Sequence, residues 1–185
     1  MASFGTALQI ADAAQVLQAT ETERWYALQT KARHEKVVKE RLEKRGVEIF
    51  LPTVTEIHRW SDRKKKVEVP LFSCYLFVRL APTKMDRLRI LCLEGVFRFV
   101  GHGNAGLPIP DEQIETVRSL VDSQVPCTPY PFFKAGQRVR ISNGSLKGVE
   151  GVLVSQNGDH TVVISVDAIQ RSLAVKVEGY KLEAV

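Results

Sequence analysis

The chain has 185 residues, of which 44% are hydrophobic and 25% are charged, a composition typical of a folded globular protein. No apolar run reaches the roughly 18–20 residues that a membrane-spanning helix needs, so none is predicted. Three cysteines, Cys74, Cys92 and Cys127, are odd in number and far apart, which excludes a disulfide framework and a CxxC metal pair. The formal charge of +5 is compatible with nucleic acid nearby but does not define a binding groove.

Residues 1–23 are interpreted as a flexible leader outside the fold. They contain three acidic residues and no basic residue, and they lack the charged start and strongly apolar middle of a secretory signal. Free cysteines are typical of a reducing compartment, so we expect a cytoplasmic protein.

The segment 24–125 predicts one α/β domain, which begins with a strand at residues 24–29. Thr30 is suited to cap a helix over residues 31–45, and Gly46 supplies the left-handed residue that commonly ends a helix. A second strand, a hairpin with a basic turn and a central buried strand should follow, at residues 47–51, 53–69 and 71–80.

The rest of this domain predicts two helices with a strand between them. Pro82 and Thr83 open a helix that runs to Leu93, and residues 96–100 form the strand. The last helix starts at Pro110 and ends near Gln124.

Residues 126–131 hold three prolines in six residues and predict a semi-rigid linker that pairs poorly in a sheet. Residues 132–185 alternate short strands with turns and predict a small β-barrel. Gly148 and Gly151 should allow a tight turn and a bulge there. The predicted fold class is therefore α+β: an N-terminal α/β sandwich, with an antiparallel sheet flanked by helices, and then the barrel.

The sequence offers no catalytic, metal or cofactor site. The four histidines are scattered without HExxH spacing, and Cys74 lies in an apolar strand, unlike a reactive thiol. We therefore expect a protein that is not an enzyme and needs no cofactor.

Five motifs in order resemble the NusG family of transcription factors. They are Trp25-Tyr26-Ala27-Leu28, PLFSCYLFV at 70–78, Glu94-Gly95-Val96 with Phe99-Val100-Gly101, residues 133–141 and residues 146–152. The resemblance covers residues 24–185 and implies a NusG N-terminal domain followed by a KOW domain, an SH3-like barrel. Residues 50–72 are similar to the specialised branch, the RfaH-like and capsule-operon antiterminators. Ser73 and Cys74 depart from the family pattern of Pro and Gly.

The resemblance implies a factor that binds RNA polymerase and suppresses pausing or termination. In this family the first domain offers an apolar hollow to the clamp helices of the largest polymerase subunit. Exposed aromatic side chains beside a sheet edge are suited to hold a helix in a groove. The matching positions are Phe72, Tyr75, Val96, Phe97 and Leu51. The same residues could instead fill the domain's own core.

A second polymerase contact, with the gate loop, would fall at Asp86, Arg87 and Leu88. For Arg87 the sequence alone also fits a solvated helix residue. The barrel of relatives recruits Rho or a small-subunit ribosomal protein, and the matching loop holds Ile169, Gln170 and Arg171. We expect a monomer with no membrane contact.

A basic run at the hairpin tip, Arg63, Lys64, Lys65 and Lys66, is suited to approach the phosphates of DNA or RNA, although most charge runs are solvated surface. Two alternative functions stay open. One is a housekeeping NusG-like factor that couples polymerase to Rho or the ribosome. The other is a KOW-type protein that binds RNA or the ribosome.

Overall fold

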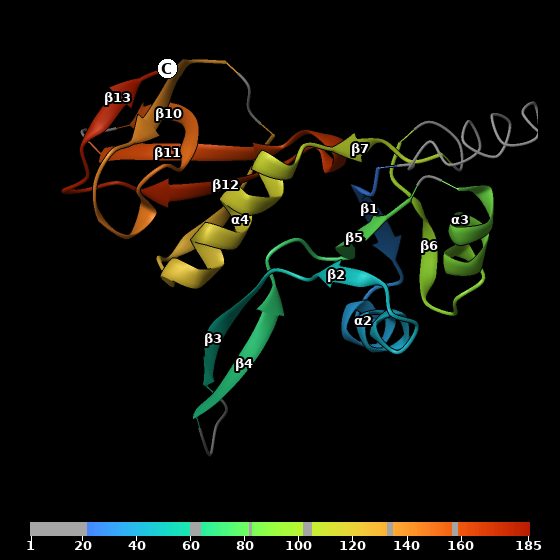
Figure 1. Ribbon diagram of the computed structural model, residues 1–185. Coiled ribbons are helices and arrows are strands. Elements are labelled where there is room, and N and C mark those ends of the chain that lie inside the picture. Colours follow the sequence, from blue (N-terminus) through green and yellow to red (C-terminus); the bar gives the residue numbers. More distant parts are fainter. Residues whose placement is uncertain (1–21, 60–63, 82, 102–104, 133–134, 157–158) are drawn as a thin grey trace, which may run out of the picture.

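The computed structural model describes residues 22–59, 64–81, 83–101, 105–132, 135–156 and 159–185. The first half is built on an antiparallel sheet with strand order β2-β5-β1-β6, and β7 pairs with β1 beside β6 (Figure 1). The strands are β1 (Arg24–Thr30), β2 (Glu48–Phe50), β5 (Tyr75–Leu80), β6 (Val96–Phe99) and β7 (Pro108–Ile109).

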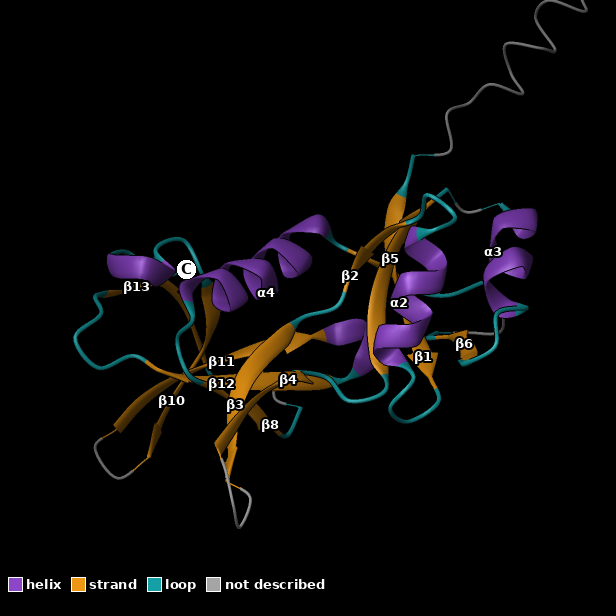
Figure 2. Cartoon of the chain, turned by 90° about the horizontal axis from the view of Figure 1, so that it is seen from below, coloured by secondary structure: helices purple, strands orange, loops and turns teal. Residues whose placement is uncertain are grey.

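The sheet is covered by helices on both faces because successive side chains of β1 point to opposite sides. Tyr26 and Leu28 pack with α2 (Glu35–Glu43) and α3 (Lys84–Leu91), whereas Trp25 and Ala27 pack on the side of α4 (Asp111–Ser123). Figure 2 shows α4 separated by the sheet from α2 and α3. These layers confirm the predicted α/β sandwich.

Two predicted helix boundaries differ from the structure. Thr83 caps α3 as expected, since its side chain accepts a hydrogen bond from the backbone N–H of Asp86. Thr30, however, is the last residue of β1 and caps nothing; α2 starts later, after His34. The backbone N–H of Thr30 donates to Cys74, and that of Lys31 donates to Gly95, which keeps this segment extended. Gly46 has φ +75° just beyond α2, as predicted.

The apolar run at 71–80 is not one strand. Only Tyr75–Leu80 forms β5, and residues 71–74 make a turn in which the N–H of Tyr75 donates to the carbonyl of Phe72 at 3.1 Å. Cys74 has φ +68°, a left-handed conformation that suits the glycine of the family pattern. The turn thus keeps the backbone path expected with glycine although a cysteine occupies it.

A two-stranded hairpin projects from this domain (Figure 1). It consists of β3 (Thr53–Arg59) and β4 (Lys64–Pro70), which pair with each other in a separate sheet, as the sequence predicts. Lys36 of α2 reaches Glu68 of β4 at 3.3 Å.

The second half is a six-stranded antiparallel sheet with strand order β13-β9-β10-β11-β12-β8. Its elements are β8 (Cys127–Tyr130), β9 (Gln137–Ile141), η1 (Gly144–Leu146), β10 (Glu150–Gln156), β11 (Asp159–Val166), η2 (Asp167–Ile169), β12 (Arg171–Lys176) and β13 (Leu182–Ala184). Gly148 has φ +91° and makes the predicted tight turn. Gly151 pairs with Val139 in continuous register, so the predicted bulge is wrong; glycine is needed there because a Cβ would lie 2.5 Å from Val162.

The proline-rich segment is a strand rather than a free linker, so the expectation that it pairs poorly in a sheet is wrong. Strand β8 pairs with β12, with Pro129 opposite Leu173. As the outermost strand, β8 tolerates a proline, whose missing N–H can face away from the sheet. Residues 124–126 alone separate α4 from the barrel sheet.

The two halves are packed together through α4. Buried side chains of this helix, such as Ile114 and Val117, belong to one apolar cluster with Leu146 and Ile169 of the barrel. Gln113 of α4 also makes two hydrogen bonds to Asp167 at the start of η2. Figure 1 shows α4 between the barrel and the first sheet.

Candidate partner-binding surfaces

An aromatic cluster lies on the α4 side of the first sheet. Phe50 of β2 and Phe77 of β5 are cross-strand neighbours whose rings stack with centroids 6.1 Å apart. Phe72 meets Phe77 edge-on at the same centroid distance, and the Arg118 guanidinium of α4 lies 4.9 Å from the centre of the Phe50 ring. Such contacts stabilise the positions of the rings in addition to their burial, so this cluster forms a rigid base for the surface above it.

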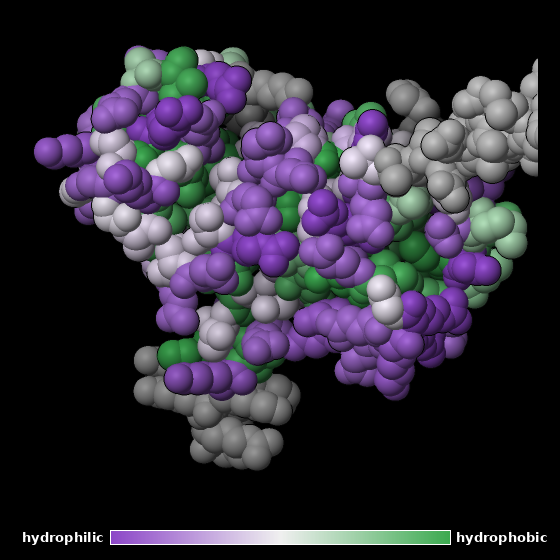
Figure 3. Space-filling model, in the orientation of Figure 1, coloured by the Kyte–Doolittle hydropathy of each residue, from purple (hydrophilic) through white to green (hydrophobic). Residues whose placement is uncertain are grey.

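Half-buried side chains surround this cluster. Phe50, Val54 and Tyr75 pack against the apolar cluster and are still partly exposed. In Figure 3, hydrophobic surface comes through between the polar side chains below α4, over β2 and β5. We call Phe50, Val54, Tyr75, Phe77 and Arg118 the aromatic floor and rim.

The five residues predicted to bind the clamp helices do not form one surface. Phe72 is 4% exposed, so its prediction as an exposed anchor is wrong: the turn at 71–74 folds its ring inward against Phe77. Leu51 is buried and packs with the α2 and α3 cluster on the opposite side of the sheet, where the half-buried Val96 also packs. Phe97 is 67% exposed on β6, the edge strand farthest from β2.

Tyr75 is therefore the one predicted clamp-helix residue that lies on the rim. Sequence reasoning missed Phe50, Val54, Phe77 and Arg118. Phe50 and Phe77 had a usable signal, since both lie in predicted strands of strong apolar character. Arg118 had none, because its position over Phe50 depends on how α4 crosses the sheet.

The three predicted gate-loop residues lie on helix α3 and differ in how accessible they are. Asp86 accepts a hydrogen bond from the Thr83 hydroxyl, and Arg87 lies over the Tyr26 ring at 5.4 Å. Leu88 points to solvent with 52% of its surface exposed. The arrangement leaves Leu88 as the accessible member, with Asp86 and Arg87 held by their neighbours.

The basic run of the hairpin is only partly described. Arg63 lies outside the described residues, Lys64 and Lys65 are in β4, and Lys66 of the same strand is exposed. The register places Arg59 opposite Lys64 and His58 opposite Lys65. The basic residues 64–66 therefore follow one another along one strand of the projecting hairpin.

The predicted barrel loop is only partly available to a partner. Ile169 is 5% exposed and fills the barrel core, so it is not a surface residue. Gln170 has the left-handed φ of +49° that ends η2, and it is exposed together with Arg171.

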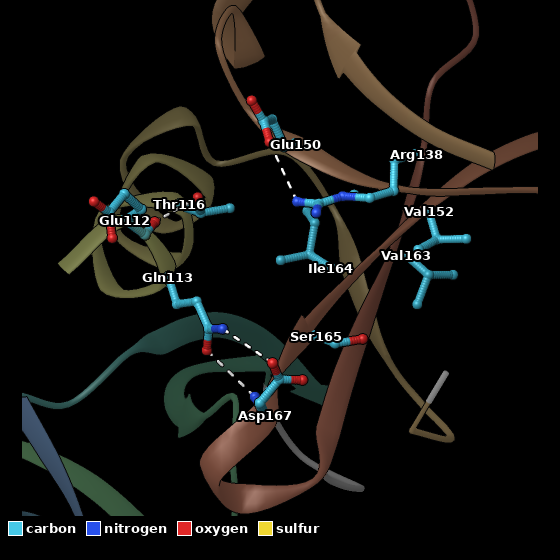
Figure 4. Close-up of a pocket in the computed structure, with 11 residues that line it drawn as sticks. Glu112, Gln113, Thr116, Arg138, Glu150, Val152, Val163, Ile164, Ser165 and Asp167 are labelled. Atoms are coloured by element: carbon cyan, nitrogen blue, oxygen red, sulfur yellow. Dashed lines mark hydrogen bonds and ion pairs between the residues drawn. The ribbon is translucent and has the colours of Figure 1, made fainter. Parts of the chain in front are cut away.

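A cavity of about 420 Å³ lies between α4 and the barrel (Figure 4). Gln113 and Asp167 point toward one another across it, at 3.3 Å for both hydrogen bonds. Glu150 pairs with Arg138 at 3.5 Å on the barrel wall. The Gln113–Asp167 pair thus joins the two halves across the cavity, whereas the Glu150–Arg138 pair lies within the barrel, so we call this cavity the seam between the halves.

Within the described ranges, no three His, Cys, Asp or Glu side chains are grouped as a metal site would require. The described helices include none that is long and apolar enough to cross a membrane.

Comparison with known proteins agrees with this architecture. The family model of NusG, described as a transcription termination factor, matches residues 23–118. The transcription termination/antitermination protein NusG of Campylobacter jejuni is 31% identical over 132 residues, which is 66% of this chain and 75% of that protein. NusG of Lactococcus lactis is 28% identical, over 87% of this chain and 92% of the relative.

A solved structure of Thermotoga maritima NusG, described by its domain interaction, has the same fold. Its TM-score is 0.50 at 22% identity, with 84% of this chain and 93% of that chain covered. The chain belongs to the NusG family of transcription termination/antitermination factors.

Proposed function

We propose that this protein binds RNA polymerase through its first domain and suppresses pausing or termination during elongation. The observation that carries the proposal is the aromatic floor and rim: stacked rings of Phe50 and Phe77, with half-buried Tyr75 beside them. Partly exposed aromatic side chains on a rigid sheet are suited to receive the apolar face of a helix. The clamp helices of the largest subunit are the proposed occupant.

The proposed mechanism needs no bond to be made or broken. Leu88, exposed on α3, would contact the gate loop while the rim holds the clamp helices. A factor that contacts both elements binds the closed clamp more tightly than the open one. It therefore shifts polymerase toward the closed state, in which pausing is disfavoured.

Binding of the full chain to core RNA polymerase tests this site. Tyr75→Ala should weaken binding at least tenfold, because it removes a rim aromatic without removing the buried Phe72. Tyr130→Ala is the matched control, a half-buried tyrosine on β8 of the barrel. Equal affinity of wild type and Tyr75→Ala would exclude the rim as the site, and no binding by wild type would overturn the function.

We also propose that the hairpin contacts nucleic acid. The proposal rests on three consecutive lysines of β4, Lys64, Lys65 and Lys66, in a projecting hairpin where Lys66 is exposed; a basic run in such a place is suited to approach phosphates. Upstream duplex DNA in the transcribing complex is the favoured ligand, because a two-stranded ribbon fits the major groove.

Anisotropy of labelled duplex measured against salt tests the hairpin. Replacing Lys64, Lys65 and Lys66 by Ala should flatten the slope of log affinity on log salt by about 2–3. Replacing Lys39 and Lys44 of the α2 segment is the control and should change it less. Equal slopes in both variants would remove the hairpin from the interface, and tight single-stranded RNA binding without polymerase would favour the RNA-binding alternative.

The barrel is proposed to recruit Rho or a small-subunit ribosomal protein through Gln170 and Arg171, which are exposed beside η2. Arg171→Glu should weaken capture of that partner by the full chain and leave polymerase binding unchanged. Loss of both would contradict a separate role for the barrel. Whether the protein serves chosen operons, as the RfaH-like resemblance implies, or all genes is tested by mapping its occupancy across the genome.

A further inference from the structure

Helix α3 presents a stripe of apolar side chains to solvent. Met85 and Leu88 are 61% and 52% exposed, and Cys92, which ends the helix, is exposed as well. At 3.6 residues per turn, these three positions lie within about 60° of one another and extend over about 10 Å along the helix. We call them the α3 stripe. Figure 3 shows hydrophobic surface over α3, the helix at the right in Figure 1.

The stripe differs from the solvent-facing sides of the other helices. In α4, all of whose 13 residues are described, each large hydrophobic side chain is buried or half-buried. Helix α2 exposes Val37 as a single apolar residue. Single apolar side chains on a surface are ordinary, whereas a group of adjacent ones is typical of a surface that contacts a partner. The spacing of the α3 stripe therefore indicates a binding surface.

The stripe is held in place from the inner side and the two ends of α3. The Arg87 guanidinium lies 5.4 Å from the centre of the Tyr26 ring in the sheet below. Thr83 caps the first turn, and Arg45, just beyond α2, donates to the carbonyl of Arg89 at 3.2 Å. A helix fixed in this way presents its outer side chains in one arrangement, which lowers the entropy lost when a partner binds.

Basic side chains border the stripe on its two sides. Lys84 and Arg89 are both exposed, and each lies about 40° around the helix from the nearer edge of the stripe. Arg89 contacts Asp86 at 3.6 Å, but an ion pair between exposed side chains contributes little, so the Arg89 charge stays available to a partner. By charge complementarity, the surface suits an apolar segment that carries carboxylates beside its apolar side chains.

We propose that the α3 stripe binds a polymerase segment whose apolar side chains are bordered by carboxylates, and that this segment is the gate loop. The inference rests on the proposed function and extends its second contact from Leu88 to Met85 and Cys92. Burial of three adjacent apolar side chains supplies the affinity, and the two flanking cations select which segment can approach. Asp86 and Arg87 then hold the helix in position and leave the contact itself to the stripe.

Alkylation of the full chain bound to core RNA polymerase tests the contact directly. In the saturated complex iodoacetamide should modify Cys92 at least about tenfold more slowly than in the free protein, because the partner would cover its thiol. Cys127 of β8 is the internal reference and should react at the same rate in both states. Peptide mass mapping separates these two thiols from those of polymerase.

The apolar part of the contact is tested by the double variant Met85→Ser, Leu88→Ser. Both residues are exposed, so the fold should be retained, and binding to core polymerase should weaken about tenfold. Val37→Ser is the control, an exposed apolar residue of α2 outside the stripe, and should bind as wild type does.

The charged part is tested by the double variant Lys84→Glu, Arg89→Glu, which should also weaken binding to polymerase. The control makes the same change of net charge on the barrel, at the exposed Lys147 and Lys181, and should leave the affinity unchanged. Equal losses in the two double variants would assign the effect to the net charge of the protein.

The outcomes separate this inference from the proposed function. An unchanged Cys92 rate in a complex that does form, or wild-type affinity of Met85→Ser, Leu88→Ser, would remove the stripe from the interface and leave the Tyr75 rim in place. Weaker binding by the apolar variant alone would contradict the proposed carboxylates of the partner. No binding of polymerase by wild type would overturn the proposed function and the stripe contact with it.

Discussion

The carboxylate of Glu35 accepts a hydrogen bond of 2.8 Å from the backbone N–H of Cys74, although the two residues are 39 positions apart. Glu35 begins α2 and is 6% exposed, and Cys74 ends the turn that precedes β5. This bond ties the helix to a turn whose left-handed residue is not glycine. It stabilises the place where Phe72 turns inward.

Glycine at position 74 should stabilise the protein. Left-handed backbone costs a non-glycine residue roughly 1–2 kcal/mol, so Cys74→Gly should raise the free energy of unfolding by about 1 kcal/mol. Cys92→Gly is the control, because Cys92 has φ −74° at the end of α3 and should lose about 0.5–1 kcal/mol. Urea denaturation measures both; a loss at both positions would contradict the strain at Cys74.

Removing the Glu35 carboxylate should destabilise the fold. In Glu35→Ala the part-buried N–H of Cys74 would lose its acceptor, at a cost of about 1 kcal/mol or more. The matched control is Glu40→Ala, an exposed glutamate of the same helix, which should change stability by less than about 0.5 kcal/mol. Equal losses in the two variants would assign the effect to helix propensity instead.

The two barrel glycines should respond differently to alanine. At Gly151 a Cβ would lie 2.5 Å from Val162 Cγ1 and 2.7 Å from the carbonyl oxygen of Val163, so Gly151→Ala should cost about 1–3 kcal/mol or more. Gly148 has open space around it and only the strain of φ +91°, so Gly148→Ala should cost about 1 kcal/mol. Thermal unfolding followed by circular dichroism ranks them, and the reverse order would refute the packing argument.

Alkylation should distinguish the three thiols. Burial raises the pKa of the Cys127 thiol above its ordinary value of 9.0, outweighing a backbone hydrogen bond that lowers it. Since the thiolate is the reactive form, iodoacetamide at pH 7–8 should modify the exposed Cys92 first and Cys127 much more slowly. As the pH rises through 9, Cys127 ionises in the unfolded chain before it ionises in the folded protein, because its pKa is raised in the folded state. The free energy of unfolding therefore decreases above that pH. Peptide mass mapping that finds Cys127 modified first would contradict its burial.

The attachment of the barrel to α4 should depend on the Gln113 side chain. Its side chain makes both hydrogen bonds to Asp167, so Gln113→Ala should loosen the barrel from α4. In ¹⁵N relaxation the halves of wild type should tumble with one correlation time, and in the variant the barrel should gain independent motion. Thr116→Ala, beside it on the same helix, is the control. Separate correlation times already in wild type would show that the halves are not held together in solution.

The order of elements could be predicted because alternating and helical apolar patterns cover most of the chain. Leu71, Phe72 and Cys74 could not be assigned correctly, since an apolar sequence suits a buried turn as well as a buried strand. The three prolines of residues 126–131, of which Pro129 lies in β8, indicate a free linker unless this strand is known to lie at a sheet edge. For the candidate site, the resemblance to the family motif identified Tyr75, but the burial of Phe72 and the position of Arg118 over Phe50 are set by long-range packing.

The pairing of β8 with β12 makes the connection between α4 and the barrel short. Residues 124–126 are the whole free connection between α4 and the barrel sheet, and three residues span at most about 11 Å. While β8 stays paired, a partner bound to the barrel would lie at a fixed distance from a partner bound to the first domain. If β8 left β12 and α4 also released the barrel, the connection would lengthen by the four residues of the strand, and the two partners could then lie farther apart.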